Sequence, residues 1–385
     1  MTRVEIAEAI PQAAEIVADV RERGDEAVLD WSERLDGARP ASLRVSDEEI
    51  WAAEVDPELL TAVRRLADAV RVFHEPQRPA DTSVSPVPGV RAERRFLPVG
   101  SVGIYAPGGR AAYPSSLVMA AVPAGLARVG RVAVASPRPT AALLATAREL
   151  GLGEIYAVGG AQAIAALAYG TETIPAVDKI VGPGNRWVTA AKLLVSGRVG
   201  IDLPAGPSEV LVVADETADP ALCAADLLAQ AEHGPDSDCV LVTTDGALAD
   251  EVFDLVGGWE QVRVETVASL DEAVARVDEY APEHLELHVA EPEALAARVS
   301  NAGSIFLGES TPAVVGDYAV GANHVLPTGG LARAAGGLGL ESFLKPVQIV
   351  SSTREGLAAM RETIEALAAA EGLPLHAAAV EARFR

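Results

Sequence analysis

Short runs of β-branched residues alternate with alanine- and leucine-rich stretches along most of this chain of 385 residues, beginning near Phe96. In the first series, β-rich runs lie at 102–105, 131–135, 155–158 and 179–181, and helical stretches lie at 115–126, 140–150, 161–168 and 186–195. Parallel strands need a crossover of a dozen or more residues between them, and that crossover is usually a helix. The alternation therefore predicts a mostly parallel sheet with helices on its faces.

A second series of the same kind follows, with expected strands at 210–214, 239–243, 262–264, 285–289 and 304–307. Helical patterns precede both series at 4–23, 25–35 and 57–73, and a strand at 347–350 and a helix at 353–370 come last. Between 308 and 339, eight glycines and little periodicity indicate a long irregular segment, which is usually functional inside a compact protein. We expect an α/β fold: two Rossmann-like α/β domains with mostly parallel sheets, a helical N-terminal segment and an extended C-terminal tail.

The composition limits the classes of partner. The formal net charge is -24, so the surface repels the phosphates of nucleic acids and anionic lipids. The chain has no run of eighteen apolar residues and its first residues do not resemble a signal peptide, so we expect a soluble, cytoplasmic protein without nucleic-acid or membrane partners. The two cysteines, Cys223 and Cys239, lack metal-ligand spacing. Only three basic residues are lysines: Lys179, Lys192 and Lys345.

Three glycine-rich turns, at 105–109, 159–162 and 182–185, follow expected strands of the first series. Ligands of open α/β folds bind at the carboxyl ends of the strands, and glycine lets a backbone approach a phosphate closely. None of the turns matches the G-x-G-x-x-G fingerprint or a Walker A loop. Each is therefore either a phosphate contact or an ordinary tight connection.

A helix predicted after Asp219 ends beside a potential metal site. Asp219 is a suitable N-cap, Pro220 suits the first turn, and a Gly-Pro pair at Gly234 ends the helix. Gln230 and His233 lie one turn apart, so both side chains can point the same way. They are either two ligands of a divalent metal, or His233 simply stabilises the negative end of the helix dipole.

The other histidines divide into two groups. His74 follows a helix end, and His288 shares a strand face with Glu286, so neither is expected to be functional. Glu283 and His284 are neighbours that could transfer protons together. Neighbours on a regular strand point to opposite faces, so this requires the irregular start that the preceding proline favours.

Two further groups of titratable residues lie near the end of the chain. Asp317 and His324 flank six residues of the glycine-rich segment, and His376 follows Glu371 by five residues. Nitrogen and oxygen ligands suit zinc or manganese. Such a set can be drawn from Gln230, His233, Asp317 and His376, although their spacing is not that of a compact metal motif.

Seven strings, in order, resemble the L-histidinol dehydrogenase family. They are YAPGG from Tyr105, GGAQAIAALA from Gly159, VGPGN from Val181, PAGPSE from Pro204, QAEHGPDS from Gln230, APEHLE from Ala281 and GDYAVGANHVLPTGG from Gly316. The similarity extends from about Val17 to His376, which is nearly the whole chain. One such string could arise by chance, but seven in order could not.

The resemblance implies an NAD-dependent enzyme that oxidises L-histidinol to L-histidine, the last step of histidine biosynthesis, through a bound L-histidinaldehyde. His284 would take the proton from the alcohol, and Glu283 would activate the water that hydrates the aldehyde. A zinc ion, with manganese as a substitute, would mainly orient the substrate. The implied metal ligands are Gln230, His233, Asp317 and His376; the implied substrate contacts are Ser208, Gln230, His233, His284, Asp317, Glu371 and His376; and the implied NAD contacts are Tyr105, Gln162 and Asn185.

The resemblance also implies a homodimer with shared active sites. We expect one α/β domain, formed by 1–104 together with 209–338, to carry the metal and catalytic residues. An NAD-binding α/β domain would span 105–208. Residues 339–385 would form a tail that reaches the partner subunit, so that Glu371 and His376 complete the partner's site.

The chain departs from the family pattern in a start that lacks about one helix and in a shorter region between 248 and 262. Trp187 and residues 333–337 also replace more usual choices. None of the named site positions is lost. Two other functions stay open: oxidation of another small polar alcohol on the same scaffold, and metal binding without catalysis.

Overall fold

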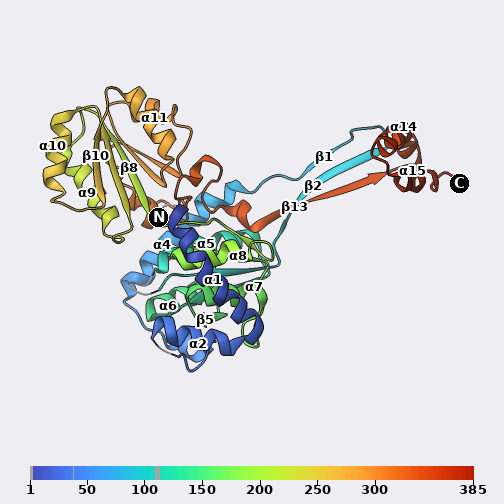
Figure 1. The fold of residues 1–385 in the computed structure, drawn as a ribbon, viewed down its shortest axis with the longest axis horizontal. Helices are drawn as coiled ribbons and strands as arrows, with labels where there is room; N and C mark the ends of the chain where they lie inside the picture. The colour runs from blue at the N-terminus through green and yellow to red at the C-terminus, as the bar shows by residue number, and fades with distance from the viewer. Residues whose placement is uncertain (1–2, 38, 109–112) are drawn as a thin grey trace. The chain divides into compact units, whose positions relative to one another are not determined.

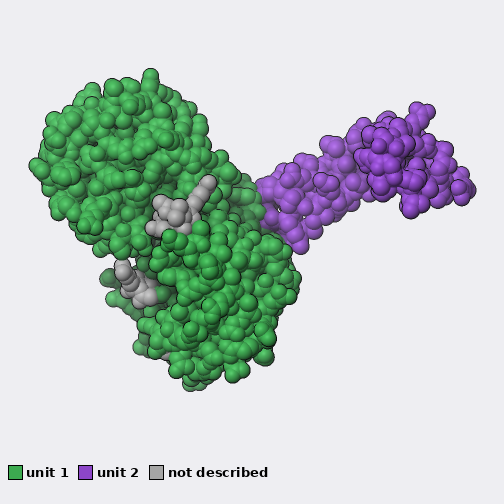
Figure 2. Space-filling view, viewed as in Figure 1, with its two compact units in different colours: residues 1–77, 99–343 green, residues 78–98, 344–385 purple. Residues whose placement is uncertain are grey.

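The computed structural model describes residues 3–37, 39–108 and 113–385 (Figure 1). It divides into two compact units (Figure 2): unit 1 is Met1–Gln77 and Val99–Phe343, and unit 2 is Arg78–Pro98 and Leu344–Arg385. Two five-stranded parallel sheets lie in unit 1, and a three-stranded antiparallel sheet lies in unit 2. The predicted α/β fold class is confirmed. None of the described helices is long and apolar enough to cross a membrane.

The first sheet of unit 1 has the strand order β5-β4-β3-β6-β7. Its strands are β3 (Ser101–Tyr105), β4 (Arg131–Ser136), β5 (Ile155–Ala157), β6 (Lys179–Val181) and β7 (Gly200–Ile201). Its connecting helices are α5 (Pro114–Ala127), α6 (Ala141–Glu149), α7 (Gly160–Tyr169) and α8 (Arg186–Val195). The first strand lies in the middle and the chain winds outward in both directions, so a ligand crevice is expected at the carboxyl ends of β3 and β6.

The second sheet repeats this winding in the order β10-β9-β8-β11-β12. Its strands are β8 (Glu209–Ala214), β9 (Asp238–Thr243), β10 (Val262–Thr266), β11 (His284–His288) and β12 (Ser304–Leu307). Its helices are α9 (Pro220–Ala231), α10 (Gly246–Leu255), α11 (Leu270–Tyr280) and α12 (Pro292–Ala296). Strands β8 and β11 are therefore the counterparts of β3 and β6.

Strand β8 shows why the sheet forms where it does. All of its residues are buried. Val210 and Val212 pack into the core that includes α9, whereas Leu211 and Val213 pack into the core that includes α11. A strand that is apolar on both faces must be covered on both faces, which is the environment of a central parallel strand.

The N-terminal helices pack on the layer that contains the first sheet. They are α1 (Arg3–Arg23), α2 (Asp25–Asp36), α3 (Asp47–Ala52) and α4 (Pro57–His74). Ile16 and Val28 share a buried cluster with Ile164 of α7, and Val63 of α4 packs with Val118 of α5. This grouping differs from the predicted one, which joined 1–104 to 209–338 and so separated these helices and β3 from the sheet they complete. Periodicity within a helix shows that it has an apolar face but does not show which partner covers that face.

Unit 2 is built from β1 (Thr82–Val84), β2 (Val90–Pro98), β13 (Leu344–Ser352), α14 (Arg354–Ala370) and α15 (Pro374–Glu381). Figure 1 shows β2 and β13 side by side, in agreement with their antiparallel pairing over nine residues each. Several large apolar side chains are exposed here: Val350 is 68% exposed, Leu367 59% and Leu375 80%. Exposed apolar side chains gathered in a small unit are typical of a surface that packs against another polypeptide.

The glycine-rich segment that precedes β13 is irregular, as predicted. Apart from short helical turns, including α13 (Val314–Tyr318), it has little regular structure. Its apolar side chains Val325, Leu326 and Leu338 are nevertheless buried. The side chain of Asn323 donates to the carbonyl of Met119 in α5, so the segment is held against the layer of the first sheet.

A buried ion pair holds the turn after β6. Nζ of Lys192 donates to Oδ1 of Asp202 at 2.5 Å and to the carbonyl of Gly182 at 2.6 Å. Oδ2 of Asp202 accepts from the amide of Gly182 at 2.6 Å. The two side chains are only 3% and 2% exposed, so the pair depends on both partners being present.

We expect Lys192→Met to lower the free energy of unfolding by about 3–5 kcal/mol, because it leaves the Asp202 carboxylate buried without its cation. The matched control Arg71→Met removes the exposed pair with Asp68 and should change stability little. Denaturant unfolding of the three proteins measures both effects. Equal midpoints for the two variants would contradict the assignment.

Candidate active site

A cleft of about 600 Å³ in unit 1 collects residues from both parallel sheets. Its walls include residues that follow β3 and β6, residues that precede β8 and begin β11, and the loop after α9. Asp317 of α13 and the following residues 324–326 complete the lining. Chain segments more than two hundred residues apart therefore meet at one site.

The two sheets present opposite edges to this cleft. In the first sheet, Tyr105 ends β3 and Asn185 follows β6, so the cleft lies at the carboxyl edge where the winding changes direction. In the second sheet, Ser208 precedes β8 and His284 begins β11, so the amino edge faces the cleft. The expectation that ligands bind at carboxyl ends therefore applies to the first sheet alone.

Gly182 allows the turn after β6 to pass directly against β3. Its φ angle is 111°, in a region that side chains rarely adopt, and a Cβ atom there would lie 2.2 Å from the carbonyl oxygen of Tyr105. Only glycine fits this approach. Residues 183–185 can therefore line the cleft beside Tyr105.

Both proton-transfer candidates are anchored by the backbone of Glu209. Nδ1 of His284 lies 3.2 Å from the carbonyl oxygen of Glu209, and Oε2 of Glu283 accepts from its amide at 2.8 Å. Nδ1 of His284 and Oε2 of Glu283 are 3.6 Å apart. Because a carbonyl oxygen can only accept, we infer that Nδ1 of His284 carries the proton and that Nε2 keeps its lone pair. The imidazole is then prepared to act as a base at Nε2.

The irregular start predicted for this strand is present. Ala281 has a φ of 54°, and β11 begins only at His284. Glu283 therefore precedes the regular strand, and its side chain need not point to the face opposite His284. Gly303 accommodates the bend, because a Cβ atom there would lie 2.6 Å from the carbonyl oxygen of Glu283. Glu283 and His284 can therefore both line the cleft.

Burial sets the proton affinities of these two groups, each of which is 5% exposed. Burial raises the pKa of Glu283 well above its usual value, and the nearby Glu209 and Asp317 carboxylates raise it further. Burial lowers the pKa of His284, although the Asp317 carboxylate opposes this change. Both shifts favour the uncharged forms near neutral pH.

The metal-ligand candidates of unit 1 are compatible with a divalent ion. His233 and Asp317 line the cleft, and Gln230 is buried in the last turn of α9. His233 follows the C-cap Glu232, so it lies just beyond the helix rather than in its last turn. In the described part of the chain, Nε2 of Gln230 has no hydrogen-bond partner. An amide would bind a metal through Oε1, and together with an imidazole nitrogen and a carboxylate oxygen it makes up the kind of donor set that zinc or manganese accepts.

Two residues of the site were not among the predicted site residues. His324 lies between Asp317 and α5: Nδ1 is 3.3 Å from the Asp317 carbonyl, and Nε2 is 3.1 Å from Oγ of Ser116. Burial lowers the pKa of His324. Glu209 follows Ser208 directly, and Oε1 of Glu209 accepts from the amide of Gly329 at 2.7 Å. Both residues belong to strings that carry the family resemblance, which was the available signal.

The three predicted NAD contacts have different surroundings. Tyr105 and Asn185 line the cleft. The hydroxyl of Tyr105 accepts from the amide of Gly160, and burial raises the pKa of Tyr105 to about 12. Oδ1 of Asn185 caps α8 by accepting from two backbone amides. Gln162 is fully buried and outside the lining, with Nε2 3.4 Å from Oδ2 of Asp36; Gly109, in the first glycine-rich turn, lies outside the described residues.

Glu371 and His376 lie in unit 2. Glu371 is the C-cap of α14, and His376 is in the first turn of α15. Both are exposed. Their role in a site shared between subunits stays a prediction.

Comparison with known proteins gives a consistent result. The family model described as histidinol dehydrogenase matches residues 1–384. The histidinol dehydrogenase of Halobacterium salinarum is 48% identical, covering 96% of this chain and 92% of the relative. The histidinol dehydrogenase of Natronomonas pharaonis is 47% identical, and the match covers 98% of this chain and 94% of that relative. The crystal structure of histidinol dehydrogenase from Elizabethkingia anophelis matches with a TM-score of 0.91 at 38% identity, covering 97% of this chain and 92% of that one.

We expect Glu209 to make stability fall as the pH rises toward 7. Burial raises the pKa of Glu209 to about 7 from a usual 4.5, and Oε2 has no hydrogen-bond partner among the residues described. The protonated form is therefore favoured in the folded state. The stabilisation that protonated Glu209 contributes to the free energy of unfolding is complete below pH 4.5 and is lost as the pH rises through 7.

The measurement is chemical unfolding of the wild type and of Glu209→Gln between pH 4.5 and 8. The wild type should lose about 2–3 kcal/mol relative to the variant over this interval. Glutamine keeps the acceptor for the amide of Gly329 but does not titrate. Parallel pH profiles for the two proteins would contradict the expectation.

Proposed function

The chain belongs to the histidinol dehydrogenase family and is an oxidoreductase of that family; from this premise we propose that it oxidises L-histidinol to L-histidine in two NAD-dependent steps at a zinc-containing site. The main support is that Glu283, His284, His233 and Asp317 line one cleft at the carboxyl edge of the first sheet. A substrate bound in this cleft would therefore lie near two proton-transfer groups, two metal-ligand candidates and a crevice of the type that binds dinucleotides.

The family resemblance supplies the residues that we assign to the cofactors. Tyr105, Gln162 and Asn185 would hold NAD, and Gln230, His233, Asp317 and the tail residue His376 would hold the metal. When bound, the nicotinamide would accept hydride, and the zinc ion would orient the imidazole and amine of the substrate. The chain itself supplies proton transfer and exclusion of water.

In the first oxidation, the substrate loses hydride from carbon and a proton from its hydroxyl oxygen. Nε2 of His284 takes that proton, because Nδ1 is engaged by the Glu209 carbonyl. The lowered pKa of His284 keeps Nε2 free to accept at neutral pH and favours release of the proton afterwards. The fixed ring orientation means that only one nitrogen faces the reaction.

In the second oxidation, water adds to the bound aldehyde. Glu283 takes a proton from that water in its ionised form, and its raised pKa means that this carboxylate holds the proton more strongly than an exposed one would. The hydrated aldehyde then loses a second hydride, and His284 takes the second hydroxyl proton. One histidinol and one water thus reduce two NAD.

We also propose that the enzyme is a homodimer in which Glu371 and His376 complete the partner's site. The support is the exposure of both residues in unit 2, together with exposed apolar side chains such as Leu367 and Leu375. A second copy would remove this apolar surface from water. The cytoplasmic location expected from the sequence stays a prediction.

The number of NADH molecules formed per histidinol tests the reaction. Under limiting histidinol we expect close to two, measured by NADH absorbance, with histidine as the product. Chelator-treated enzyme should be inactive, and added zinc should restore it. One NADH with free aldehyde, or full activity without metal, would contradict the proposal.

His284→Asn should lower kcat by about 10²–10⁴-fold, because a positioned base is lost. The matched control is His74→Asn, which removes another buried histidine; Nδ1 of His74 pairs with Gln77 at 2.9 Å, and His74 is outside the cleft lining. That variant should keep its kcat while it remains folded. Equal losses in the two variants would indicate a structural effect instead of a catalytic one.

Mixing two inactive variants tests the shared site. His284→Asn and His376→Ala chains, unfolded and refolded together, should regain roughly a quarter of wild-type activity, since half of the dimers are mixed and each has one intact site. Each variant refolded alone should stay inactive. No recovery in a mixture that forms dimers would show that each site uses its own tail.

A further inference from the structure

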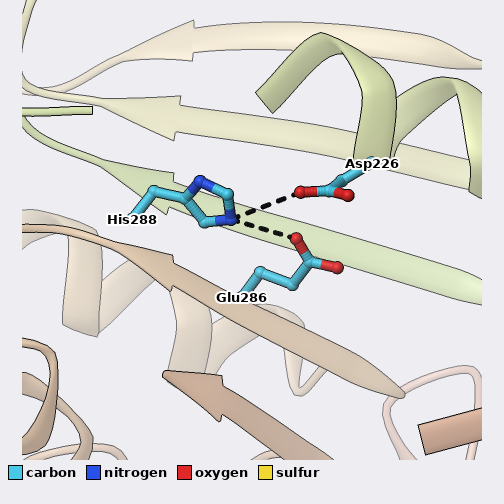
Figure 3. A group of neighbouring side chains, drawn as sticks. All are labelled: Asp226, Glu286 and His288. Carbon is cyan, nitrogen blue, oxygen red and sulfur yellow. Dashed lines mark hydrogen bonds and ion pairs between the residues drawn. The ribbon is translucent and has the colours of Figure 1, made fainter. Parts of the chain in front are cut away.

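A second cluster of potential metal ligands lies in unit 1, outside the cleft lining. It consists of Asp226 of α9 with Glu286 and His288 of β11 (Figure 3). Nε2 of His288 is 3.4 Å from Oδ2 of Asp226 and 3.2 Å from Oε2 of Glu286. One ligand atom from each residue lies within 4.8 Å of the others. Figure 3 shows both carboxylates directed toward the same ring nitrogen.

The strand pattern explains how these residues meet. Glu286 and His288 are two residues apart on β11, so they share a face, whereas Leu285 and Leu287 point into the opposite core. Asp226 comes from the helix that follows β8, the strand paired with β11. The shared face predicted for Glu286 and His288 is confirmed. This face would normally bury apolar side chains, but in β11 it carries a carboxylate and an imidazole.

Burial makes the cluster unfavourable without a cation. The side chains of Glu286 and His288 are each 1% exposed, and that of Asp226 is 14% exposed. Two carboxylates and one imidazolium would still carry a net negative charge. A divalent ion with a neutral imidazole would cancel the charge completely.

The distances from Nε2 of His288 to the two carboxylates agree with those between ligands of one ion. Charge-assisted N–H···O bonds are usually about 2.7–2.9 Å long, and both contacts of His288 are longer, at 3.2 and 3.4 Å. An ion with tetrahedral bonds of about 2.0–2.1 Å separates its ligand atoms by roughly 3.3 Å. The spacing matches the edge of such a tetrahedron.

The surroundings leave the right atoms available. Oε1 of Glu286 accepts from the amide of Ala313 at 2.6 Å, which leaves Oε2 for an ion. Nδ1 of His288 lies 3.7 Å from Sγ of Cys223, which leaves Nε2. These contacts at Oε1 of Glu286 and Nδ1 of His288 hold the two side chains so that Oε2 and Nε2 point toward the shared position. The residual exposure of Asp226 provides a path for the ion.

The location agrees with the topology. His288 is the last residue of β11, beside β8, so the cluster lies toward the carboxyl ends of the two strands where the winding changes direction. This is where open α/β sheets bind ligands. In the first sheet, the equivalent edge lines the cleft.

We propose that Asp226, Glu286 and His288 bind a second divalent transition-metal ion, zinc or manganese, distinct from the ion proposed at Gln230, His233 and Asp317. The ion is structural. It joins α9, which carries Gln230, to β11, which begins with His284, and Glu286 also holds Ala313 immediately before α13. It thereby ties together the elements that position the cleft residues.

Metal content per chain tests the proposal. Full-length protein is saturated with zinc, desalted and measured by elemental mass spectrometry. We expect about two zinc ions in the wild type, one in Glu286→Gln and one in His233→Ala. One ion in the wild type and none in His233→Ala would overturn the second site. One ion in the wild type, none in Glu286→Gln and one in His233→Ala would support it while contradicting the cleft metal.

Two additions keep the outcome decisive. The control His74→Asn removes a buried histidine outside both sites and should retain two ions; a loss there would show that the counts follow general destabilisation and would overturn the site. If Glu286→Gln does not fold, cobalt titration of His233→Ala provides the answer. Binding of one Co²⁺ with the visible absorption of a nitrogen- and oxygen-ligated ion is expected, and no binding would overturn the proposal.

Discussion

The backbone of Glu209 positions the two side chains proposed to transfer protons, because its amide donates to Glu283 and its carbonyl contacts His284. This is possible because β8 and β11 are adjacent, with Val210 paired to His284. The hydrogen-bond ladder of a buried sheet therefore sets the distance between Glu283 and His284. A slip of one residue in this register would turn His284 away from the carbonyl that selects its tautomer.

One winding pattern is used twice, with different results. Both sheets of unit 1 place their first strand in the middle. The first opens its carboxyl edge to the cleft, through Tyr105 and Asn185. The second turns its amino edge there, through Ser208 and His284, and buries charged side chains near its other edge. The same topology thus provides a crevice in one case and an ionic cluster in the other.

The sequence identified every strand of the second sheet and four strands of the first, because central parallel strands such as β8 are almost entirely apolar, but it missed the two-residue edge strand β7. It did not identify β2, whose charged and mostly exposed residues have no apolar pattern. Ser208, His233, Glu283, His284 and Asp317 were identified through local strings and do line one cleft. Glu209 lies in one of these strings, but it holds Glu283 and His284 through its backbone, and His288 contacts Asp226, sixty-two positions away, so a local pattern could not show either set of contacts.

The burial of Lys192 also affects how the molecule can be handled. Of the three lysines, Lys192 is bound to Asp202, and Lys179 donates to the carbonyl of Ser342. Lys345, in β13 of unit 2, is exposed. Among the lysines, amine-directed dyes, cross-linkers and coupling resins would therefore react mainly with Lys345, because the amines of Lys179 and Lys192 are engaged in hydrogen bonds. Conventional conjugation would act almost as a site-specific method, with the label on the small antiparallel sheet of unit 2.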